Sequence, residues 1–61
     1  MNSVEMVKAK ALLKKYVADD AYEKRTDKGY VVVAVFSDCE KVFRTLREVE
    51  LEVSFHRSIE D

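Results

Sequence analysis

Proline and tryptophan are absent from this chain of 61 residues, and cysteine, histidine and glycine each occur only once. A lone cysteine cannot form a disulfide within the chain. One cysteine and one histidine do not supply the four ligands of a structural zinc site. Disulfides, metals and oligomerisation are the usual aids to stability in so short a domain. Because the first two are excluded, we expect association with another chain.

The chain also lacks the signatures of several protein classes. No apolar run approaches the ~20 residues of a membrane span. There is no glycine-rich phosphate loop, no HExxH or CxxC motif and no nucleophile elbow. We therefore expect no catalytic site, no metal, no cofactor and no enzymatic activity. The lone cysteine and a charged N-terminal segment unlike a secretion signal favour the cytoplasm.

What the chain does contain is typical of a single globular domain over residues 1–61. Hydrophobic residues make up 48% of it and charged residues 38%, and the net charge is −1. A disordered segment has fewer apolar residues, and a typical nucleic-acid-binding domain is strongly basic. Composition therefore favours a small folded protein that contacts other proteins. No motif identifies a family.

Residues 3–18 have the pattern of an amphipathic helix. Asn2 or Ser3 can cap it, and with Asn2 as the cap, Glu5 completes a capping box. The expected core side carries Met6, Ala9, Leu12, Leu13, Tyr16 and Val17. The opposite side has a thin apolar stripe that includes Val4, Val7 and Ala11. This stripe is one candidate interface, although small apolar residues also occur singly on monomer surfaces.

The segment that follows predicts a β-hairpin. In TDKG, residues 26–29, Asp27 and Lys28 suit the centre of a type I turn, and Gly29 supplies the residue with positive φ. The first strand, about 21–26, is polar on both faces and suits a sheet edge. The second, 30–36, is apolar on both faces, which is typical of a strand covered on both sides.

The segment SDCE, residues 37–40, matches a capping box, with Ser37 as the cap and Glu40 three residues later. We therefore predict a second helix over 38–47. Cys39 falls in its first turn, between Asp38 and Glu40, and these acidic neighbours oppose formation of a reactive thiolate. We therefore interpret Cys39 as a small apolar side chain and not as a nucleophile.

Residues 49–55 fit two patterns. Val49, Leu51, Val53 and Phe55 alternate with polar residues, as in a half-buried strand. Two helical stripes also run through this region: Val42, Leu46, Val49 and Val53, and separately Leu51, Phe55 and Ile59. We favour the strand, which predicts an α+β fold in the order α-β-β-α-β, a three-stranded sheet with both helices on one face. The alternative is α-β-β-α with one long C-terminal helix.

In the favoured fold nothing remains to cover the second face of the sheet. The second strand presents on that face either Val31, Val33 and Val35, which are the interface candidates, or the set Tyr30, Val32, Ala34 and Phe36. An exposed apolar patch of this kind marks an interface. The first hypothesis is therefore a small non-enzymatic interaction or regulatory protein that forms a homodimer or docks on a protein partner. The sequence does not name that partner or the biological process.

The second hypothesis is a nucleic-acid-binding module built on the first helix and the hairpin. Its possible phosphate contacts are Lys8, Lys14, Lys15, Lys24 and Arg25. The near-zero net charge makes this the weaker of the two hypotheses. We interpret His56 as a solvated side chain or as the partner of a nearby carboxylate.

Overall fold

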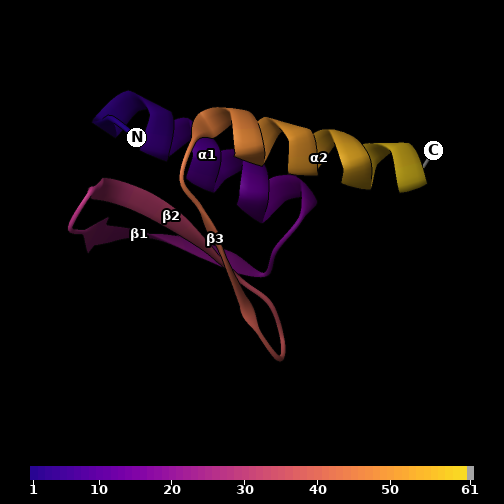
Figure 1. Ribbon diagram of the computed structural model, residues 1–61. Coiled ribbons are helices and arrows are strands. Elements are labelled where there is room, and N and C mark those ends of the chain that lie inside the picture. The colour runs from indigo at the N-terminus through magenta and orange to yellow at the C-terminus, as the bar shows by residue number, and fades with distance from the viewer. Residues whose placement is uncertain (61) are drawn as a thin grey trace.

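Two helices and three strands make up the described part of the chain in the computed structural model, which covers the backbone of residues 1–60 and the side chains of residues 1–57. They follow the order α1 (Ser3–Tyr16), β1 (Asp20–Thr26), β2 (Gly29–Val35), β3 (Glu40–Phe43) and α2 (Leu46–Glu60). Both helices lie on one face of the sheet (Figure 1). The α+β class, the three-stranded sheet and the two helices are confirmed. Neither described helix is long and apolar enough to cross a membrane.

The sheet is an antiparallel meander with β2 in the centre. The predicted first hairpin is confirmed: Thr26 pairs with Gly29, and Gly29 has a φ of 121°. The Thr26 hydroxyl donates to the Gly29 carbonyl at 2.6 Å, which closes the turn. Asp27 and Lys28 keep negative φ, so the single glycine supplies the one positive φ among the described residues.

The order of the last two elements differs from the prediction. Residues 36–39 are a loop between β2 and β3, and the third strand is residues 40–43, where a helix was expected. The Phe36 amide donates to the Cys39 carbonyl at 2.8 Å, and no residue of this loop needs positive φ. A hairpin loop built on negative φ values requires neither glycine nor asparagine, so their absence was misleading. Both pairs of neighbouring strands are antiparallel.

The predicted strand over 49–55 is wrong, because these residues are helical. The alternative prediction of a C-terminal helix is correct here, although it omitted β3. Thr45 caps α2: its hydroxyl accepts from the Glu48 amide at 3.2 Å. The Glu48 carboxylate in turn accepts from the Arg44 amide at 2.7 Å. T-x-x-E at 45–48 is therefore the capping signal that the chain uses.

The start of α1 is as predicted. Asn2 Oδ1 accepts from the Glu5 amide at 2.9 Å, and Glu5 Oε1 accepts from the Asn2 amide at 3.0 Å. These reciprocal bonds satisfy two of the amides that a helix leaves without partners at its N-terminus.

One hydrophobic core joins the helices to the inner face of the sheet. The register places Ala21 beside Ala34 and Val32 beside Phe43 on this face. The helices add Met6, Ala9 and Leu13 from α1 and Val49 and Val53 from α2, all of them buried. The stripe Val49–Val53 is thus the core side of α2, while the Ile59 side chain lies outside the described residues.

The two capping signatures allow a matched test of the corrected order. Thr45→Ala removes the hydroxyl that caps α2, so we expect the free energy of unfolding to fall by about 1 kcal/mol. Ser37→Ala changes an exposed loop residue and should alter it by less than about 0.5 kcal/mol. Urea unfolding followed by circular dichroism measures both. A larger loss in the Ser37 variant would contradict the assignment of α2.

Candidate functional site

The apolar stripe of α1 lies on the side of the helix that faces away from the sheet. Val4 and Val7 are 78% and 62% exposed, Ala11 is also exposed, and the opposite side of the helix is buried. The predicted exposure of the stripe is confirmed. Its use as an interface stays a prediction.

A second pair of exposed apolar residues lies on α2. Leu51 and Phe55 are 60% and 61% exposed, one helical turn apart. The i, i+4 spacing in the sequence was the signal for them. The strand predicted over 49–55 places Leu51 and Phe55 on the same side as Val49 and Val53. That prediction therefore did not identify Leu51 and Phe55 as exposed. In the helix they instead lie away from that buried side.

The helices α1 and α2 pack side by side on the sheet (Figure 1), and each carries exposed apolar residues. We call Val4, Val7, Ala11, Leu51 and Phe55 the outer helix surface. Between the helices, Lys8 Nζ lies 3.9 Å from Glu50 Oε2. The outer helix surface therefore consists of two apolar groups, one on each helix, with the Lys8–Glu50 contact between the helices.

Glu52 links α2 to the edge strand β3. Its carboxylate lies 2.6 Å from Lys41 Nζ and 3.0 Å from His56 Nε2. The hydrogen bond from Lys41 lowers the pKa of Glu52, and the contact with His56 adds to this effect, against the opposing effect of desolvation. His56 thus pairs with a carboxylate, one of its two expected environments. Among the described residues no group of three or more metal-binding side chains occurs.

The outer sheet face, the side away from the helices, is less open than expected. Val31 and Val33 are only 7% and 2% exposed, and Val35 is half-buried. Tyr22 and Val42 flank Val33 in the register, and the Tyr22 hydroxyl crosses β2 to donate to Glu40 at 3.1 Å. The expectation of an open valine patch is wrong, because side chains of the edge strands cover the central valines.

The five predicted phosphate contacts do not share one surface. Lys8 pairs with Glu50, and Lys14 Nζ lies 3.5 Å from Asp20 Oδ1. The Lys15 ammonium lies over the ring of Tyr16, 5.2 Å from its centre. Lys24 and Arg25 are neighbours on β1 and therefore point to opposite faces of the sheet.

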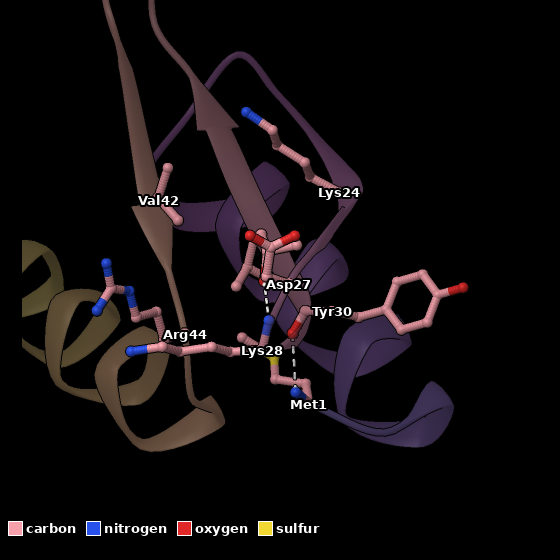
Figure 2. Close-up of a pocket in the computed structure, with 9 residues that line it drawn as sticks. Met1, Lys24, Asp27, Lys28, Tyr30, Val42 and Arg44 are labelled. Atoms are coloured by element: carbon pink, nitrogen blue, oxygen red, sulfur yellow. Dashed lines mark hydrogen bonds between the residues drawn. The ribbon is translucent and has the colours of Figure 1, made fainter.

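Lys24 instead groups with two other cations. With Lys28 from the β1–β2 turn and Arg44 after β3, it lines an open cleft of about 450 Å³ on the outer sheet face. Figure 2 shows the Lys28 side chain extended toward Arg44, with Val42 beside them. We call this the cationic cleft. Lys24 pairs with Val31 in the register of β1 and β2, and Arg44 follows the last residue of β3, Phe43, which pairs with Val32. The position of Arg44 near Lys24 therefore follows only from the correct assignment of β3.

Cys39 lies exposed in the β2–β3 loop. Desolvation raises the pKa of its thiol, and the charge and hydrogen bonding of Asp38 raise it further. A raised pKa reduces the thiolate fraction at neutral pH, so the local environment does not activate the sulfur.

Comparison of the chain with protein-family models, with curated proteins and with solved structures finds no match. The candidate surfaces are therefore the outer helix surface and the cationic cleft, each assigned from its own geometry.

The lowered pKa of Glu52 predicts a pH-dependent contribution to stability. A carboxyl whose pKa is lower in the folded state stabilises the fold above its ordinary value of 4.5, and this contribution is lost as the pH falls through the folded value. We expect Glu52→Gln to cost roughly 0.2–1 kcal/mol at neutral pH and almost nothing in strong acid.

Thermal unfolding of both proteins across the acid range measures this difference. Glu50→Gln is the control, since Glu50 is exposed and its contact with Lys8 is long. An equal cost of Glu52→Gln at neutral and at acid pH would show that the carboxylate charge is not responsible.

Proposed function

We propose that this chain is a small non-enzymatic interaction protein that self-associates through its outer helix surface. The observation that carries the proposal is the exposure of Val4, Val7, Leu51 and Phe55, each at least 60% accessible, on two adjacent helices. Large apolar side chains exposed on neighbouring helices are candidates for an interaction site, because large exposed apolar patches are typical of such sites.

The charges on this surface favour a second copy of the chain as the partner. A two-fold contact brings the same patch of both copies together, so every charge must meet its complement on an identical surface. Lys8 and Glu50 provide one charge of each sign between the helices. In a two-fold pair, Lys8 of one copy can face Glu50 of the other.

Simple energetics predict a dimer of moderate strength. Completing the burial of four such side chains on each copy contributes roughly 10 kcal/mol in total at the usual transfer energies. Association costs an estimated 4–15 kcal/mol in lost motion and side-chain ordering. The low end of that cost leaves about 6 kcal/mol, so we expect dissociation at tens of micromolar, where association depends on the concentration of the protein.

Sedimentation equilibrium at concentrations above the expected dissociation constant tests the proposal, with a dimer mass expected for the unchanged protein. Leu51→Lys places a charge within the contact and should weaken association by at least about tenfold. Ser37→Lys adds the same charge in the exposed β2–β3 loop and should leave the mass unchanged. A monomer at these concentrations, or equal effects of the two substitutions, would contradict the proposal.

A further inference from the structure

The cationic cleft lies at the end of the sheet that carries the β1–β2 turn and brings together cations that form no ion pair. Among the described side chains, Lys24, Lys28 and Arg44 form no ion pair. Asp27 is the one carboxylate that lines the cleft. Met1 also lines the cleft, and its ammonium group donates to the Tyr30 carbonyl at 2.9 Å. Four positive charges and one negative charge leave a net charge of +3 in this space.

The shape of the cleft also favours a ligand larger than a simple ion. Its volume of about 450 Å³ lies in the range of small-molecule sites, and much of it is left when one oxyanion is accommodated. Val31 and Val42 add apolar surface to the lining of the cleft. Three cations from β1, the turn and the end of β3 thus share the cleft with apolar side chains.

We propose that the cationic cleft binds the phosphate group of an organic phosphate, with the organic part against Val31 and Val42. A phosphomonoester carries two negative charges above its second pKa of about 6, so it offsets most of the net positive charge of the cleft. A single carboxylate supplies half as much negative charge. The guanidinium of Arg44 offers a planar pair of donors to two phosphate oxygens, and the lysines act as point charges around it.

Titration of the isotopically labelled protein with AMP, followed by amide chemical shifts, tests the proposal. We expect saturable shifts confined to Lys24, Lys28, Val31, Val42 and Arg44. Lys24→Gln, Lys28→Gln and Arg44→Gln should each weaken binding by roughly tenfold, because each removes a charge-assisted hydrogen bond.

Arg25→Gln is the matched control. It removes the same charge from the residue next to Lys24, but on the opposite face of the sheet. AMP binding should therefore be unchanged in this variant. An equal loss in the Arg25 and Lys24 variants would overturn the proposal, because it would show attraction to the overall charge and not to the cleft.

Further arms of the titration distinguish the sources of the phosphate. Inorganic phosphate and a short single-stranded oligonucleotide are added in place of AMP, with glutamate as the carboxylate comparison. Tightest binding of AMP indicates that the ligand is a small organic phosphate. Tightest binding of the oligonucleotide indicates that it is a nucleic-acid backbone. Each of these results supports the proposal if the Lys24, Lys28 and Arg44 variants lose the binding. Equal binding of glutamate, or no saturable shift with any phosphate, would overturn it.

Stability without ligand gives a second readout. Three unpaired cations around one cleft repel one another, so Lys28→Gln or Arg44→Gln should raise the melting temperature in phosphate-free buffer. Phosphate should raise it for the unchanged protein more than chloride does at equal ionic strength. A lower melting temperature in both variants without phosphate would indicate a structural role for the two cations and would overturn the proposal.

Discussion

The central strand β2 sets the constraint on which the rest of the structure depends. Its residues from Val31 to Ala34 are almost fully buried, yet they point alternately to the two faces of the sheet. The helices can cover only one of those faces, and they cover Val32 and Ala34. Val31 and Val33 point to the other face, so side chains of the sheet itself must cover them.

The edge strands provide that cover with long side chains. Tyr22 and Glu40 meet across β2, and the desolvation that accompanies this contact raises the pKa of Tyr22, to which the hydrogen bond with Glu40 adds. Toward the turn, Lys24 pairs with Val31 in the register. The aliphatic parts of such cations cover apolar surface while their charges stay in water. The charge of the cationic cleft is thus a consequence of how the outer face is covered.

The parts of the fold set by local chemistry were predictable from the sequence. The capping box at Asn2 and Glu5 and the positive φ of Gly29 each depend on a few neighbouring residues, and both were predicted. The second half of the chain holds two capping signatures, at Ser37 and at Thr45, of which only one starts a helix. The choice depends on whether residues 40–43 pair with β2, which is a contact distant in sequence.

The same long-range pairing explains why the candidate surfaces were only partly predictable. The exposure of Val4 and Val7 follows from helix periodicity and was predicted. Leu51 and Phe55 required the correct element type, and the grouping of Lys24 with Arg44 required the correct partner for β2. A sequence pattern specifies the side of an element on which a residue lies, but the sheet register decides which residues of different elements meet.

The two surfaces have a joint consequence, because one belongs to the helix layer of the fold (Figure 1) and the other is lined mainly by residues of the sheet and its first turn. If two copies pack helix layer against helix layer, their sheets face outward and both cationic clefts stay open. The dimer then presents two phosphate sites on opposite sides. Two linked sites raise the effective affinity for a ligand only when its phosphates can reach both. A single small phosphate cannot span the dimer, so any gain from pairing is restricted to long polyanions.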